Sequence, residues 1–184
     1  YLRPAQPGPV EIQITELKSG KRFSTGHLVM RNANTHETII ASIGTVGDLS
    51  APATGADAEA AAFQLVESTP PDLPDPDDCF QTSDEGEQYV PPFFSQVHVR
   101  FHPDDAGFMQ GAPTGTPRLR GWFRLRDGGD MKIAASTLPL LVAVDAFPPT
   151  IFNSTDIRGW SPTLELTAHL RGKPVPGWIA CEVK

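Results

Sequence analysis

The stretch at residues 67–92, "ESTPPDLPDPDDCFQTSDEGEQYVPP", limits what this chain of 184 residues can fold into. It is rich in proline and acidic residues and poor in apolar side chains. Such a composition buries too little apolar surface to offset the entropy that is lost on ordering. We therefore expect a linker or long surface loop at residues 69–92, with folded segments before and after it.

The charges are distributed unevenly along the chain. Between Asn32 and Val99 there is no Lys or Arg, against twelve Asp and Glu, while the remainder carries fifteen basic and ten acidic residues. The formal net charge is −7. An acidic balance of this size disfavours a general nucleic-acid-binding protein, so we expect no nucleic-acid partner.

Cysteine content and hydropathy favour a cytoplasmic protein. Cys79 and Cys181 are too few for a disulfide scaffold, which favours a reducing compartment. No apolar run reaches the roughly 18 residues of a membrane span, and no secretory signal is visible, so we expect no membrane partner. The chain opens without Met and closes within an apparent strand, so we expect a piece of a longer protein.

Three strands are expected before the linker. "PVEIQITEL" at residues 9–17 alternates, with Val10, Ile12 and Ile14 on one face. Turns at "KSGK" and "NANTHE" then separate strands at residues 22–32 and 38–48. The pattern predicts an antiparallel meander.

After the linker we expect strands at residues 93–102, 117–126, 161–171 and 177–183, with one helix among them. In "STLPLLVAVDAFPP", residues 136–149, Ser136 or Thr137 can cap a helix of about ten residues that the two prolines end. The segment is apolar nearly all round, which predicts burial on most sides, with a sheet wrapped around it.

Asp145 is the one carboxylate in that segment. On a wrapped helix it would be partly desolvated and close to the negative end of the helix dipole, so we expect its proton affinity to rise. Such a group can act as a general base or orient a water molecule. The alternative is a hydrated carboxylate at a helix end.

Alternation in "SPTLELTAHLR" places four polar side chains on one face: Thr163, Glu165, Thr167 and His169. The simplest interpretation is a solvated face, and the sharper one is a Thr163 hydroxyl directed at Asp145. Glu165 and His169 are about 13 Å apart on a strand, which is too far to share a metal ion. We therefore predict no metal site.

Four arginines share one face of the strand in "PRLRGWFRLR", together with Trp122: Arg118, Arg120, Arg124 and Arg126. A solvated strand surface is one interpretation. The other is an anion site, because arginine pairs well with phosphate and tryptophan can stack on a base. The acidic remainder of the chain favours a small phosphorylated ligand over single-stranded nucleic acid.

These features together resemble the acyl-CoA thioesterase II-type family, whose members contain two hotdog domains in one polypeptide. The "YLRP" opening, with its charged turn and following strand, looks like the stretch after the first domain's helix. "LPLLVAVDAFPP" resembles the second domain's helix with the catalytic Asp, and "SPTLELTAHLR" resembles the next strand, which begins with the catalytic Thr. The resemblance assigns Asp145 and Thr163 to the family's Asp/Thr/Gln trio.

The resemblance implies an α+β double hotdog fold, with antiparallel sheets around central helices. It divides the chain into the C-terminal part of a first hotdog domain at residues 1–68, the linker at 69–92 and most of a second domain at 93–184. It also implies truncation at both ends, with the first helix before Tyr1 and the Gln strand beyond Lys184. Hotdog domains pair through their sheets, so a homo-oligomer is expected.

The implied activity is hydrolysis of fatty or similar acyl-CoA to free acid and CoA, with no cofactor beyond the substrate. The four arginines are candidates for the CoA phosphates. One alternative is a non-catalytic acyl-CoA-binding protein. Another is an enoyl-CoA hydratase of the hotdog type, which pairs Asp with a His five residues later, where this chain has Thr150.

Overall fold

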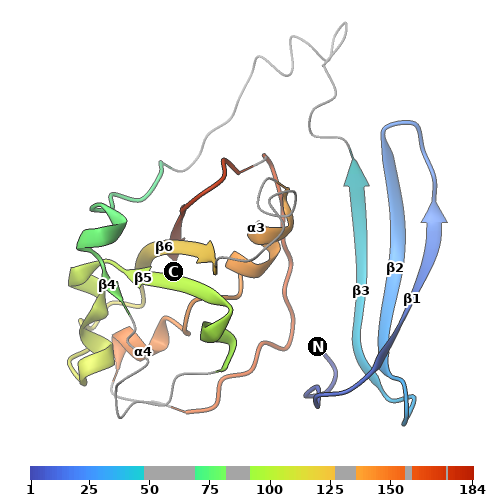
Figure 1. Ribbon diagram of the computed structural model, residues 1–184, viewed down its shortest axis with the longest axis horizontal. Coiled ribbons are helices and arrows are strands. Elements are labelled where there is room, and N and C mark those ends of the chain that lie inside the picture. The colour runs from blue at the N-terminus through green and yellow to red at the C-terminus, as the bar shows by residue number, and fades with distance from the viewer. Residues whose placement is uncertain (48–68, 82–91, 127–135, 156–158, 173) are drawn as a thin grey trace, which may run out of the picture. The chain divides into compact units, whose positions relative to one another are not determined.

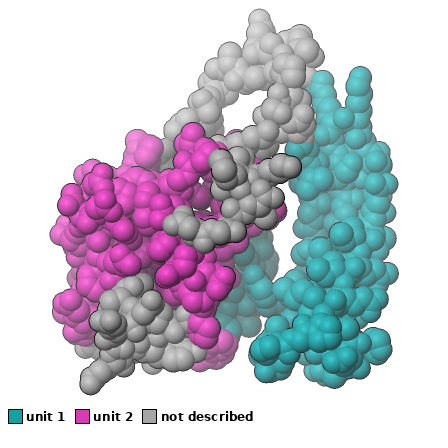
Figure 2. Space-filling model, in the orientation of Figure 1, with its two compact units in different colours: residues 1–64, 162–167 teal, residues 65–161, 168–184 magenta. Residues whose placement is uncertain are grey.

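The computed structural model describes residues 1–47, 69–81, 92–126, 136–155, 159–172 and 174–184. The chain forms two compact units, residues 1–64 with 162–167 and residues 65–161 with 168–184 (Figure 2). Each unit contains one antiparallel sheet. Within the ranges described, no helix has the length and hydrophobicity that crossing a bilayer requires.

The first unit is the expected meander of three strands, β1 (Val10–Lys18), β2 (Phe23–Asn32) and β3 (Thr38–Gly47) (Figure 1). The turn between β2 and β3 is closed by Asn32, whose Oδ1 accepts from the backbone nitrogens of Asn34 and Thr35 at 2.8 and 3.1 Å. An asparagine side chain in this role mimics a backbone turn. The prediction of a meander is confirmed.

The register of this sheet preserves the alternation seen in the sequence. Ile12 pairs with Met30 and Ile14 with Leu28, so the apolar side chains share one face. Ile14 nevertheless keeps 71% of its surface exposed, and Ile39 is the one buried residue among the described residues of the unit. The "YLRP" opening lies beside Ile39, whose carbonyl accepts from Leu2 N at 2.8 Å.

The second unit contains a four-stranded sheet in the order β4-β5-β6-β7. Its strands are β4 (Phe80–Gln81), β5 (Val97–Phe101), β6 (Leu119–Leu125) and β7 (Ile179–Val183). Burial alternates along β5 and over most of β6, so one face is apolar and the other is polar. The last three strands confirm three of the four predicted after the linker.

The core lies against the apolar face of this sheet. Phe101 and Phe123 are fully buried, and Phe101 makes edge-to-face contacts with Phe108 and Phe147 at centroid distances of 5.6 and 5.7 Å. Phe108 comes from the 3₁₀ helix η3 (Pro103–Gln110). The remaining buried members of the core are Val97, Val99, Ala106, Leu119, Ala143 and Ala146.

The predicted ten-residue helix is shorter than expected. α3 spans Leu138–Ala143, the Ser136 hydroxyl accepts from Leu138 N, and a second short helix, α4 (Ile151–Ser154), follows the two prolines. Pro139 and Ala143 are buried, but Leu138 is 52% exposed. The prediction of burial on most sides was wrong, because a helix of six residues presents less than two turns to the sheet.

The prediction of a strand at residues 161–171 was also wrong. Residues 159–172 are not assigned to a strand, although Leu164 O accepts from the Tyr1 backbone nitrogen at 2.9 Å. Leu164 is 75% exposed. Alternation describes which side chains would share a face, but a strand also needs a neighbour that pairs its backbone groups.

Part of the acidic stretch is bound to the polar face of the second sheet. Trp122 Nε1 donates to Pro74 O at 2.9 Å, and Arg100 Nη1 donates to Pro76 O and to the Asp77 carboxylate. The segment contains the 3₁₀ helix η1 (Pro76–Asp78). Residues 82–91 of the predicted linker lie outside the described residues, and its role as a linker stays a prediction.

A buried ion pair joins η3 to β6. Arg120 Nε and Nη2 donate to the two carboxylate oxygens of Asp105 at 2.8 and 3.1 Å, and the Arg120 backbone nitrogen donates to the same carboxylate at 3.0 Å. Asp105 is 4% exposed. Burial alone would raise the pKa of Asp105, but the hydrogen bonds and charge of Arg120 outweigh it and lower that pKa.

Asn153 of α4 connects three segments of the second unit from a position with no exposed surface. Its Nδ2 donates to Arg118 O at 2.8 Å, and its Oδ1 accepts from Thr114 N at 3.1 Å. The amide group therefore satisfies one donor and one acceptor that are otherwise removed from water. Residues 153–155, "NST", match the acceptor pattern for N-glycosylation, and burial of Asn153 makes its amide inaccessible in the folded chain.

We expect Asp105→Asn to lower the free energy of unfolding by about 3 kcal/mol at pH 7, because it leaves a buried guanidinium without its charge partner. Since folding lowers the pKa of Asp105, the pair stabilises the native chain above about pH 4 and loses this contribution as the pH falls through the folded-state pKa. Denaturant titrations from pH 3 to 7 measure both effects. Asp104→Asn, at an 82% exposed side chain, is the matched control; equal stability of the two variants would contradict the assignment.

Asn153→Ala should lower the free energy of unfolding by about 2 kcal/mol or more, since it leaves Thr114 N and Arg118 O without hydrogen-bond partners. Asn153→Asp should also destabilise, because a carboxylate accepts from Thr114 N but cannot donate to Arg118 O. Urea unfolding of both variants, with Asn34→Ala as an exposed control, tests this. A stable Asn153→Asp variant would show that the bond to Arg118 contributes little.

Candidate functional site

Asp145 lies two residues after the end of α3, near the end of the segment that the sequence singled out. Its backbone nitrogen donates to Val142 O at 3.3 Å, while Ala146 beside it is 3% exposed and belongs to the core. The Asp145 side chain is exposed, whereas partial desolvation was expected. The chain therefore holds a carboxylate at the surface on a backbone that its buried neighbours anchor.

Thr163, the predicted partner of Asp145, is half-buried in residues 162–167 of the first unit. Asp145 belongs to the second unit. Their pairing around a reacting group therefore stays a prediction.

The four arginines that the sequence marked as candidate ligands have different environments, although two lie on the polar face of β6 and two flank the strand. Arg120 is engaged in the buried pair with Asp105. Arg118 and Arg124 are half-buried, and the Nε of each is shielded from solvent without a hydrogen-bond acceptor. Arg126, just after β6, is exposed.

The sheet adds two residues that sequence analysis missed, Arg100 and Trp178. The Cζ atoms of Arg100 and Arg124 lie 4.9 and 4.6 Å from the centroid of the Trp178 ring, and His98 approaches the same ring edge-on at 6.2 Å. The pairings of His98 with Arg124 and of Phe123 with Ile179 bring these residues together. The available signal was the alternation in "VHVRFH", but the strand register could not be read from it.

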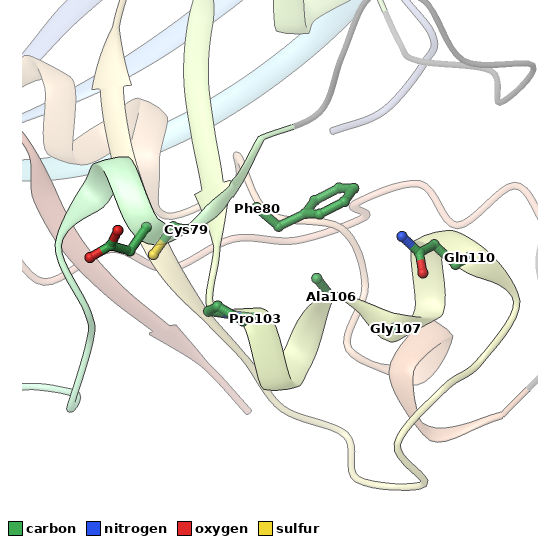
Figure 3. Close-up of a pocket in the computed structure, with 7 residues that line it drawn as sticks. Cys79, Phe80, Pro103, Ala106, Gly107 and Gln110 are labelled. Carbon is green, nitrogen blue, oxygen red and sulfur yellow. The ribbon is translucent and has the colours of Figure 1, made fainter.

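A surface cavity of about 290 Å³ lies beside η1, β4 and η3 (Figure 3). Phe80, Pro103 and Ala106 give it an apolar wall, and Gln110 adds an amide group. The other lining residues are Asp78, Cys79 and Gly107. None of the predicted site residues lines this cavity.

His102 and the two cysteines are residue types that often act in catalysis, but here His102 has a structural role and the thiols are poorly ionised. His102 Nδ1 accepts from Asp104 N at 3.1 Å and caps η3, as a structural residue. Burial raises the pKa of the Cys181 thiol to about 12, and burial, opposed by the charge of Arg100, also raises the pKa of Cys79. Among the described residues, no cluster of His, Cys, Asp and Glu could hold a metal ion.

Two family models match the chain. Residues 70–184 match the acyl-CoA thioesterase C-terminal domain, and residues 1–47 match the acyl-CoA thioesterase N-terminal domain. No curated protein gives a significant match.

Solved structures extend the comparison. A protein assigned as a thioesterase II from Thermobifida fusca YX is 31% identical, with a TM-score of 0.74 over 98% of this chain and 62% of its own. A hotdog-fold protein of unknown function from Alicyclobacillus acidocaldarius is 15% identical, with a TM-score of 0.57 over 78% of this chain and 46% of its own. A protein assigned as a thioesterase from Novosphingobium aromaticivorans DSM 12444 is 17% identical, with a TM-score of 0.53 over 94% of this chain and 59% of its own. The chain thus spans less than two thirds of each of these proteins.

The raised thiol pKa values predict slow alkylation of the folded protein. At pH 8 only about one Cys181 thiol in 10⁴ is ionised, so iodoacetamide should label it about a thousandfold more slowly than in the unfolded chain. Mass spectrometry of timed samples, with and without guanidinium chloride, measures this ratio for both cysteines. Fast labelling of either thiol in the folded protein would reopen a nucleophilic role.

Proposed function

The chain belongs to the acyl-CoA thioesterase family, and from this membership we propose that the protein hydrolyses acyl-CoA thioesters to a free acid and CoA. The observation that carries the proposal is the match of its C-terminal domain model to residues 70–184, which is more than half of the chain. The likeness to the Thermobifida fusca protein supports the same activity. We further propose the double hotdog arrangement, with residues 1–68 from the first domain and 93–184 from the second.

The proposed base is Asp145. Its carboxylate removes a proton from a water molecule while the water oxygen attacks the thioester carbonyl carbon, and Thr163 orients the water through its hydroxyl. The tetrahedral intermediate then collapses, the C–S bond breaks, and CoA leaves as a thiolate that takes up a proton. The exposed position of Asp145 supports this role, since a base must reach its water.

A covalent intermediate is not needed in this scheme. A thiolate is already a good leaving group, so direct attack by water suffices. The raised pKa values of Cys79 and Cys181 agree with this scheme, because neither thiol supplies an activated nucleophile.

Positive charge for the CoA phosphates is proposed to come from the polar face of β6. The residues that the sequence marks for this role are Arg118, Arg120, Arg124 and Arg126. Arg120 is already paired with Asp105, so that pair adds little net charge, and the positive charge would come mainly from the other three guanidinium groups.

Asp145→Asn should lower the turnover of acyl-CoA by about 10²- to 10⁴-fold, the range expected for loss of a general base. Release of free CoA thiol from acyl-CoAs of graded chain length measures this in the intact protein, and Thr163→Ala should show a smaller loss. Asp72→Asn, at an exposed acid of the second unit, is the matched control.

Full turnover by Asp145→Asn would remove Asp145 from the mechanism. If the unmodified protein binds acyl-CoA but releases no thiol from any chain length, a non-catalytic acyl-CoA-binding protein becomes the better description.

A further inference from the structure

The polar face of the second sheet brings two arginines to one tryptophan ring. Arg100 on β5 and Arg124 on β6 each place the guanidinium carbon within 5 Å of the Trp178 ring centroid. The two guanidinium carbons are therefore less than about 10 Å apart, which is the Debye length at 0.1 M salt. At this distance salt does not fully screen the repulsion between the two positive charges. An arrangement of this kind is favourable when negative charge lies beside it.

Only one of these two cations is compensated within the described part of the chain. Arg100 Nη1 carries the bonds to Pro76 O and to the Asp77 carboxylate. The side chain of Arg124 has no hydrogen-bond or ion-pair partner among the described residues, and its Nε is shielded from water. Of these two cations, Arg124 is therefore the one without an anionic partner among the described residues.

The tryptophan does not replace the missing anion. The face of an aromatic ring attracts a cation through its quadrupole, but the ring has no net charge and accepts no conventional hydrogen bond from the guanidinium edge. Trp178 instead holds the Arg124 side chain in a fixed position. The planar guanidinium group of Arg124 can then donate two parallel hydrogen bonds to two oxygens of one anion.

We propose that Arg124, with Arg100 and Trp178, forms a binding site for a phosphate group. Arg124 is the main ligand through its paired N–H groups, Arg100 adds a second guanidinium group that already contacts Asp77, and Trp178 holds both side chains in place. A phosphate group suits two neighbouring guanidinium groups better than a carboxylate, because it offers more acceptor oxygens.

The chemistry of the ligand is a phosphomonoester or diphosphate. Where that ligand is CoA, the proposal rests on the proposed function and concerns the phosphate-bearing end of the substrate, distant from the bond that is hydrolysed. Free inorganic phosphate offers the same chemistry, so the test must separate the two sources.

Calorimetric titration of the intact protein with CoA, with 3′,5′-ADP and with inorganic phosphate tests the site without any thioester. We expect Arg124→Gln to weaken binding of the phosphate probe by about 10-fold or more, the scale of a charge-assisted hydrogen bond. Arg124→Lys should retain part of the affinity, because it keeps the charge but loses the fork. Arg171→Gln removes the same charge from an exposed position of the same unit and is the matched control.

Parallel weakening for CoA and 3′,5′-ADP assigns the site to the nucleotide end of CoA, and weakening confined to inorganic phosphate assigns it to the free ion. Unchanged affinity of Arg124→Gln for all three probes, in a variant whose unfolding curve matches the unmodified protein, overturns the proposal. Because these titrations require no hydrolysis, failure of the site and failure of thioesterase activity are separate results.

Discussion

The buried pair of Asp105 and Arg120 is the constraint on which the second unit depends. Burying either charge alone is costly, so η3 and β6 are stable at this depth only when the two groups meet. Their meeting brings Ala106 and Phe108 against the apolar face of the sheet, where Phe108 packs edge-to-face on Phe101. The ion pair and the apolar core contacts thus both hold η3 against β6.

The face of β6 that carries Arg120 has a second role farther along the strand. Alternation along β6 turns Leu119 and Phe123 into the core and leaves Trp122 and Arg124 outside. The outer groups are then compensated unevenly, since Trp122 is bound by the proline-rich segment and Arg124 is not. This difference within one strand face separates a structural contact from a candidate binding site.

Hydrolysis by a positioned water molecule places modest demands on a fold. It requires a carboxylate that solvent can reach and a scaffold that fixes it, and it requires no activated thiol. Asp145, exposed beside the buried Ala146, meets the first requirement within its own unit. Cys79 and Cys181 are unsuited to covalent catalysis because burial stabilises their neutral thiols.

The amino-acid sequence by itself determined the strands of the meander, the strands β5, β6 and β7, and the class of the protein. Period-two alternation and turn residues are local, so they can be read without knowing what a strand packs against. The same local signals failed at residues 161–171, where side chains alternate but no strand is formed. They also failed at α3, which is shorter and more exposed than its apolar sequence predicted. Composition predicted a linker or long surface loop at residues 69–92, but it could not show that Trp122 and Arg100 donate hydrogen bonds to Pro74 and Pro76.

Only the tertiary structure decided the partners of the charged groups. The sequence presented Arg118, Arg120, Arg124 and Arg126 as equivalent members of one strand face. Strand register and the position of η3 engaged Arg120 with Asp105 and brought Arg124 beside Trp178, 54 residues away in the chain. Electrostatic interactions depend on distance in space and on burial, and neither quantity is present in the order of the residues.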